Sequence, residues 1–100
     1  MGERAIRRVV IHGRVQGVGY RDWTRHVARG RSIEGWVRNR TYGSVEALFA
    51  GPAEAVAGMI EACRTGPPSA RVERIDEQDA APSDLDLRRP GESFSVLGTV

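Results

Sequence analysis

The feature that most constrains the fold is the stretch GRVQGVGYR at residues 13–21, where the hydrophobic pattern changes its period. Before this stretch, residues 5–12 alternate so that Val9 and Ile11 share one face, which predicts a strand. From Tyr20 onwards, apolar residues instead recur at helical spacing. The three glycines between them therefore have to turn the chain from a strand directly into a helix.

The remaining patterns predict further strands and a second helix. The predicted elements are a helix from Tyr20 to about Arg31 with Gly30 as a stop, a strand over 33–38, a turn over 39–43, a strand over 44–50, a helix opened by Gly51-Pro52 and ended by Gly66-Pro67-Pro68, a bulged strand over 70–79, a polar loop over 80–91 and a last strand over 92–97. The order β-α-β-β-α-β is typical of the ferredoxin-like α+β sandwich, in which two helices cover one face of an antiparallel sheet. One hundred residues allow one core, so we expect residues 1–100 to form a single domain.

Composition predicts a soluble globular protein, because 40% of the residues are hydrophobic and 28% are charged. No apolar run approaches the ~20 residues of a membrane span, and the N-terminus lacks the apolar centre of a signal peptide. The single cysteine, Cys63, excludes an internal disulfide. It lies in the apolar stripe of the second predicted helix, so we expect a buried, inert thiol. These features predict a cytoplasmic protein that does not enter a membrane.

Charge is distributed unevenly along the chain. Residues 1–40 contain ten arginines against three acids, a net +7, whereas residues 41–100 contain five arginines against ten acids, a net −5. The positive half includes the glycine-rich stretch, and its field attracts anions, either small phosphates or nucleic acid. No lysine is present, which excludes lysine chemistry. His12 and His26 show no ligand spacing with Cys63, so no metal site is predicted.

The glycine-rich stretch has the composition of a phosphate cradle. Glycines allow left-handed turns that aim backbone N–H groups at one anion, and the start of the following helix adds its own unpaired N–H groups. Arg21 falls in the first helical turn, where its guanidinium can bind two phosphate oxygens at once. Neither a P-loop lysine motif nor the GxGxxG dinucleotide motif occurs. On these residues alone, a flexible connector with a solvated Arg21 remains an alternative.

Two stretches together resemble the acylphosphatase family: GRVQGVGYR at 13–21 and GWVRNRTYGSV at 35–45. Their spacing and the predicted element order agree with that family over essentially the whole chain. The resemblance implies hydrolysis of a small acyl phosphate to a carboxylate and inorganic phosphate, which is product and inhibitor, with no metal or organic cofactor. It further implies that Arg21 binds the phosphoryl group and that Asn39 orients the attacking water. The implied phosphate-binding loop consists of Val15, Gln16, Gly17, Val18, Gly19 and Tyr20.

Three segments depart from the common family pattern. Arg31-Ser32-Ile33 replaces Leu-Gly-Leu, which leaves the end of the first helix open. Tyr42-Gly43 replaces Asp-Gly, which makes Tyr42 a candidate for altering access to the site. The chain ends in SVLGTV rather than in a basic-aromatic ending. None of these departures affects Arg21 or Asn39.

Two alternative functions fit the same fold. RNA-recognition domains share the βαββαβ order but place stacking aromatics on their two central strands. Here the first strand has no aromatic residue and the third has only Phe49, which we expect to face inward; we also expect Trp23 and Trp36 to pack rather than stack on bases. The second alternative is a non-catalytic ligand-binding module, and a simple turn role for Asn39 also remains open. We expect a monomeric enzyme without a specific nucleic-acid partner.

Overall fold

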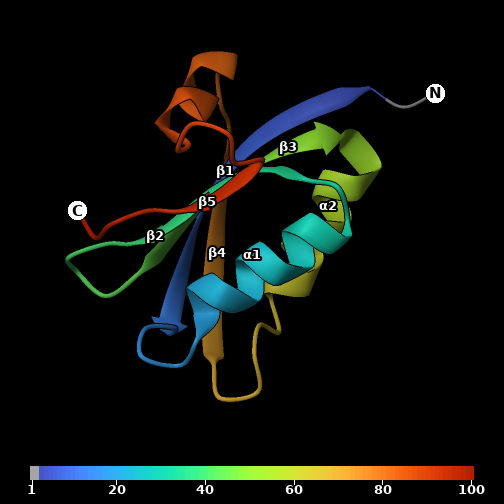
Figure 1. Ribbon diagram of the computed structural model, residues 1–100. Helices are drawn as coiled ribbons and strands as arrows, with labels where there is room; N and C mark the ends of the chain where they lie inside the picture. The colour runs from blue at the N-terminus through green and yellow to red at the C-terminus, as the bar shows by residue number, and fades with distance from the viewer. Residues whose placement is uncertain (1–2) are drawn as a thin grey trace.

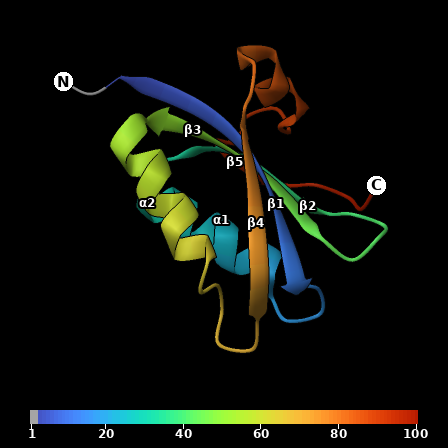
Figure 2. The same ribbon diagram turned by 180° about the vertical axis from the view of Figure 1, so that it is seen from behind.

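The computed structural model describes residues 3–100 and contains the predicted order of strands and helices, with one added short helix. The elements are β1 (Arg4–Arg14), α1 (Tyr20–Gly30), β2 (Glu34–Asn39), β3 (Val45–Pro52), α2 (Ala53–Cys63), β4 (Arg71–Asp79), the 3₁₀ helix η1 (Pro82–Leu87) and β5 (Phe94–Val96). Both α-helices pack on one face of the sheet, and η1 lies on the other (Figure 1; Figure 2).

The sheet has the strand order β4-β1-β3-β2-β5. The first four strands pair antiparallel, which confirms the predicted ferredoxin-like α+β fold. The fifth strand departs from a purely antiparallel sheet, because β5 pairs parallel with β2. After β4 the chain crosses the sheet through η1 and reaches the opposite edge, and this long connection leaves β5 running in the direction of β2. Of the strand predicted over 92–97, the paired part is Phe94–Val96.

The main core lies between the sheet and the two α-helices. Its buried members include the inward-facing residues predicted from the strand and helix patterns: Val9, Ile11, Val37, Val45, Ala47, Phe49, Val56, Met59, Ile60 and Cys63. The predicted burial of Cys63 is confirmed, and this burial raises the pKa of its thiol to about 12. Trp23 packs against this core from α1, and its ring centroid lies 5.4 Å from that of Tyr20.

A second, smaller core lies on the other face of the sheet, where the sequence predicted only a polar loop. Residues 80–91 instead contain η1, whose Leu85 packs with Trp36 and Leu48. The indole N–H of Trp36 donates to the carbonyl oxygen of Asp84 at 2.8 Å, so the predicted packing role of Trp36 is confirmed. The loop prediction is wrong because η1 spans 6 residues with one buried apolar side chain, which leaves no period to detect.

The predicted bulge is present in β4, where β1 approaches the glycine-rich stretch. His12 pairs with Arg74 and Gly13 pairs with Val72, which leaves Glu73 between them without a partner on β1. Gly13 has φ +129°, and a Cβ atom at this position would lie 2.1 Å from a backbone carbonyl oxygen of β4. Glycine is therefore required at the point where β1 ends and the loop begins.

The end of α1 accommodates the departure from the family pattern. Ser32 has φ +57° and is the only non-glycine residue with a positive φ among residues 3–100. Its N–H donates to the carbonyl oxygen of Arg29 at 3.1 Å, and the N–H of Ile33 donates to that of Ala28 at 2.9 Å. Ser32 thus takes the left-handed position for which the common pattern has glycine, and α1 ends at Gly30 as predicted.

Candidate active site

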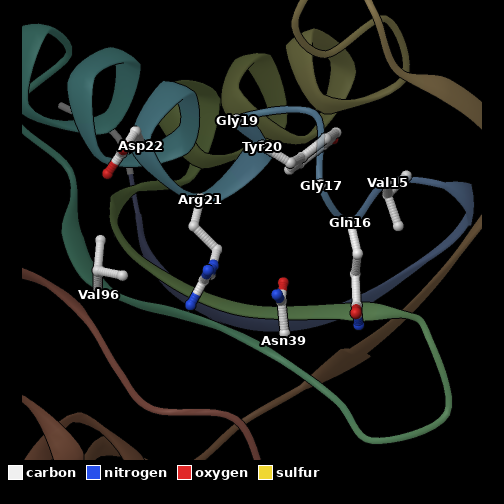
Figure 3. A pocket seen from close by; sticks show the side chains of 9 residues that line it. All are labelled: Val15, Gln16, Gly17, Gly19, Tyr20, Arg21, Asp22, Asn39 and Val96. Carbon is white, nitrogen blue, oxygen red and sulfur yellow. The ribbon is translucent and has the colours of Figure 1, made fainter.

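A pocket of about 200 Å³ opens at the end of the sheet where β1 leads into α1 and where β2 ends (Figure 3). It brings together seven of the eight predicted site residues. Its lining consists of Val15, Gln16, Gly17, Gly19, Tyr20, Arg21, Asp22, Asn39 and Val96. The exception is Val18, whose side chain packs against the main core instead of lining the pocket.

Two lining residues, Asp22 and Val96, were not predicted from the sequence. Asp22 follows Arg21 in the first turn of α1, so its position next to a candidate site residue was the available signal. Val96 reaches the pocket from β5, which lies there because it pairs parallel with β2. That pairing joins segments far apart in the chain, and no local pattern indicates it.

The glycine loop leaves the start of α1 open towards the pocket. Gly17 and Gly19 have φ values of +72° and +78°, in the left-handed region that favours glycine. Gly19 is the N-cap residue, and the first helical hydrogen bond runs from the N–H of Trp23 to its carbonyl oxygen at 3.1 Å. Within residues 3–100, the N–H groups of residues 20–22 have no hydrogen-bond acceptor. These donors and the helix dipole make this wall of the pocket positive.

The side chain of Arg21 extends from the first turn of α1 towards Asn39 (Figure 3). Among residues 3–100 its guanidinium forms no ion pair, and the adjacent carboxylate of Asp22 instead pairs with Arg25 at 3.3 Å. The donors of the Arg21 guanidinium therefore stay available for an anion in the pocket.

Asn39 forms the opposite wall of the pocket, as the last residue of β2. Its side chain points from the strand towards the glycine loop (Figure 3). Its backbone carbonyl oxygen accepts a hydrogen bond from the N–H of Val100 at 3.3 Å, whereas its side-chain amide has no partner in the described chain. The backbone is thus held, and the amide can donate to or accept from a small molecule such as water.

Tyr20 and Gln16 contribute structure rather than charge to this site. The hydroxyl of Tyr20 donates to the carbonyl oxygen of Cys63, and burial raises the pKa of the phenol, which keeps it protonated. The side-chain amide of Gln16 donates to the carbonyl oxygens of Arg40 and Ser44, both at 2.8 Å. The sequence predicted both residues only as members of the loop.

Other candidate residues lie away from the pocket. Tyr42 is 97% exposed and does not line the pocket, so the expected effect on access is not found. His12 pairs with Asp76 at 3.0 Å, where hydrogen bonding from the Arg74 guanidinium lowers the pKa of the Asp76 carboxyl. Among residues 3–100, no three His, Cys, Asp or Glu side chains are grouped so that they could hold a metal ion. No helix of the described chain is long and apolar enough to cross a bilayer.

Fold and pocket first define a class: a ferredoxin-like α+β domain with an open helix start, an unpaired arginine and a free asparagine amide in one pocket. The family model described as acylphosphatase matches residues 7–94. An acylphosphatase of Rhodopseudomonas palustris (strain BisB18) is 61% identical over 95 residues, covering 95% of this chain and 96% of that protein. The acylphosphatase of Bradyrhizobium diazoefficiens is 58% identical and covers 97% of this chain and 98% of that protein.

Solved structures agree with this assignment. The crystal structure of acylphosphatase from Bacillus subtilis superimposes with a TM-score of 0.79 at 33% identity, covering 95% of this chain and 99% of that chain. The chain belongs to the acylphosphatase family, and these relatives indicate that it is a hydrolase.

Proposed function

We propose that this chain hydrolyses the carboxyl-phosphate bond of small acyl phosphates, giving a carboxylate and inorganic phosphate, in the pocket between α1 and β2. The observation that carries the proposal is the pairing of complementary groups across one pocket. An unpaired Arg21 and an open helix start lie on one wall, and the free amide of Asn39 lies on the other. Membership of the acylphosphatase family supports the same reaction.

Arg21 and the loop N–H groups bind the phosphoryl group in this proposal. A guanidinium holds two phosphate oxygens in a fixed geometry. The backbone N–H groups of the loop from Val15 to Tyr20, with those of Arg21 and Asp22 at the open helix start, take further oxygens. Phosphoryl transfer depends mainly on positioning and on stabilisation of the charge on the equatorial oxygens. Both are supplied here by groups that the fold orients before substrate arrives.

Asn39 orients the attacking water. The amide is neutral, so it adds no negative charge beside the phosphate, and it can accept from or donate to the water. The water oxygen forms a bond to phosphorus, the bond from phosphorus to the acyl oxygen breaks, and the carboxylate leaves with the electron pair. The carboxylate is a good leaving group and needs no general acid. The proton of the water passes to a phosphate oxygen. The carboxylate in the pocket lining that could otherwise accept it is that of Asp22, and this carboxylate pairs with Arg25 at 3.3 Å, which supports the assignment.

The alternative of specific RNA binding receives no support from the aromatic residues. Phe49, on a central strand, is buried in the main core. Trp36 faces the other side of the sheet, but Leu85 of η1 packs over it. RNA-recognition domains need such rings exposed for stacking. We therefore propose an enzyme without a specific nucleic-acid partner. It acts as a monomeric single domain over residues 1–100 in the cytoplasm, without metal or organic cofactor.

A phosphate-release assay tests the proposal, with a simple aryl acyl phosphate as substrate and with or without excess EDTA. We expect turnover that is unchanged by the chelator and competitive inhibition by inorganic phosphate. Loss of activity on chelation, restored by a divalent cation, would overturn the metal-independent mechanism. Phosphate binding without turnover would instead support the non-catalytic ligand-binding module.

A further inference from the structure

We propose that Gln16 is a positioning residue: its side-chain amide sets the distance between the phosphate-binding loop and Asn39 by holding the turn that follows β2. This inference rests on the proposed function, because it concerns the same pocket. It assigns to a side chain of the loop a role distinct from that of the backbone N–H groups.

The contacts of Gln16 are specific. Its Nε2 atom lies 2.8 Å from the carbonyl oxygen of Arg40 and 2.8 Å from that of Ser44. An amide nitrogen has two N–H donors, so each acceptor takes one of them. Because both neighbours are acceptors, they also determine which end of the amide is the nitrogen.

The turn that Gln16 binds is closed by its own hydrogen bonds. The N–H of Arg40 donates to the carbonyl oxygen of Ser44 at 2.8 Å, and the N–H of Gly43 donates to that of Arg40 at 3.0 Å. Gln16 adds a second donor to each of these two carbonyl oxygens. The loop and the turn are therefore joined as one hydrogen-bonded unit.

The strand order explains why such a link matters. The loop leaves β1 and Asn39 ends β2, but β3 lies between these strands in the sheet. The two halves of the pocket are thus not neighbours in the hydrogen-bonded ladder. Gln16 spans the gap at the start of β3 and holds Arg40, the residue directly after Asn39.

The other side of the same segment is held by the end of the chain. The N–H of Val100 donates to the carbonyl oxygen of Asn39 at 3.3 Å, and the N–H of Thr41 donates to that of Val100 at 2.9 Å. These bonds restrain the turn but do not reach the loop. Gln16 therefore provides the side-chain link between the phosphate-binding wall and the water-orienting wall. A displacement of about 1 Å between reacting groups can cost on the order of a hundredfold in rate.

The test uses Gln16→Met, which keeps the length of the side chain and removes both donors. We expect kcat to fall by about tenfold to a hundredfold, while the inhibition constant for inorganic phosphate changes much less, because Arg21 and the loop N–H groups remain. The control is Gln78→Met, since Gln78 is the other glutamine of the chain and lies on β4 outside the pocket. It should retain the wild-type kcat.

A double-mutant cycle with Asn39→Ala separates positioning from general structure. If Gln16 acts through Asn39, adding Gln16→Met to Asn39→Ala costs little further activity. Losses that multiply, or an unchanged kcat in Gln16→Met alone, would overturn the inference. If Gln16→Met melts at a lower temperature than the wild type, Gln16→Asn provides a second variant, because the asparagine side chain is too short to reach both carbonyl oxygens.

Nuclear magnetic resonance gives a readout that does not depend on turnover. The side-chain N–H protons of Gln16 should exchange slowly with solvent, and Gln16→Met should shift the side-chain amide signal of Asn39. Fast exchange, or an unshifted Asn39 signal, would contradict the inference. An inactive wild-type protein would count against the proposed function, whereas these signals would still decide the role of Gln16.

Discussion

The helices α1 and α2 occupy equivalent places in the two β-α-β halves of the sheet, and each contains 11 residues. Neither has a side-chain cap at its start, since the N-cap residue is Gly19 in α1 and Pro52 in α2. Each also has an acid in its first turn, Asp22 in one and Glu54 in the other. The two helix starts differ in what their N–H groups face.

At the start of α2, the first helical N–H group is bound by the chain itself. β3 runs to Pro52, and the N–H of Ala53 donates to the carbonyl oxygen of Glu3 at 2.6 Å. Pro52 is thus the N-cap residue, and the helix that Gly51-Pro52 was predicted to open begins at Ala53. At α1, residues 15–19 separate the strand from the helix and open its N–H groups to the pocket. The comparison shows that the loop of residues 15–19, rather than the fold, distinguishes the half with α1 and the pocket from the half with α2.

The largest expected effect on kcat comes from Asn39, the last residue of β2, which is the strand after α1. Asn39→Ala should lower kcat by about a hundredfold to a thousandfold, the cost of one preorganised transition-state contact. The inhibition constant for phosphate should change little, because the other wall is intact. Asn39→Asp should be no better, since it adds a negative charge next to the phosphate. Steady-state kinetics and thermal melts measure both quantities.

The matched control for Asn39 lies at the end of β4, the strand after α2. There Asp79 pairs with Arg7 at 2.6 Å, outside the pocket. Asp79→Ala should leave kcat unchanged. If Asn39→Ala lowers the melting temperature and preserves kcat, then Asn39 only shapes the turn, and its proposed role is wrong.

The next effect tests the guanidinium of Arg21, because the first turn of α2 contains no arginine. Arg21→Lys keeps the charge but loses the two-point grip, so phosphate binding and kcat/KM should weaken by about 1.5–3 kcal/mol, or tenfold to a hundredfold. Arg25→Lys, one turn further along α1 and outside the pocket, should have little effect. Titration with phosphate should shift the amide signals of the glycine loop and leave those at the start of α2 in place. An anion bound only against Arg88 and Arg89, which follow η1 and do not line the pocket, would contradict the phosphate cradle.

The ends of the two helices extend the comparison, because each is followed by a left-handed residue. After α2 this residue is Gly66, with φ +65°, and a Cβ atom there would lie 2.6 Å from the ring of Tyr20. Gly66→Ala should lower the free energy of unfolding by about 2 kcal/mol or more, from backbone strain and overlap together. Gly98→Ala is the control, since a Cβ atom at Gly98 meets nothing within 4 Å. Equal melts for the two variants would contradict this account.

The smallest effect concerns Ser32, which takes the left-handed position after α1 with φ +57°. Ser32→Gly should raise the free energy of unfolding by up to about 1 kcal/mol, because the relief of strain exceeds the added freedom of the unfolded chain. Ser69→Gly, at a position without positive φ, should instead be neutral or destabilising. Chemical denaturation measures both, and a destabilised Ser32→Gly would show that the serine is not strained.

The parts of this protein that the sequence predicted are those with a local signal. Alternation identified the inward faces of β1 and β3, and helical spacing identified the buried stripe of α2. The resemblance of two motifs to the acylphosphatase family implied one site for Arg21 and Asn39, and the structure places both in one pocket. Their catalytic roles stay predictions.

The parts that were not predicted depend on contacts between distant segments. Leu85 of η1 packs on Trp36 in the smaller core. Val96 lines the pocket because β5 pairs in parallel with β2 at the edge of the sheet. The two hydrogen bonds of Gln16 to the turn at 40–44 likewise join separate parts of the chain. None of these contacts has a periodic pattern, so the sequence of one chain contains no signal for them.

Cys63 gives this protein a built-in probe for slow opening. Its thiol is completely buried and its pKa is raised to about 12, so a thiol-modifying reagent reacts only after the segment around α2 opens. The rate of labelling therefore reports how often the segment around α2 opens. The backbone of Cys63 is bonded to Tyr20, which lines the pocket, so phosphate bound there should slow the labelling by mass action. Occupancy of the site can then be followed by modification of a single sulfur atom, without any substrate being consumed.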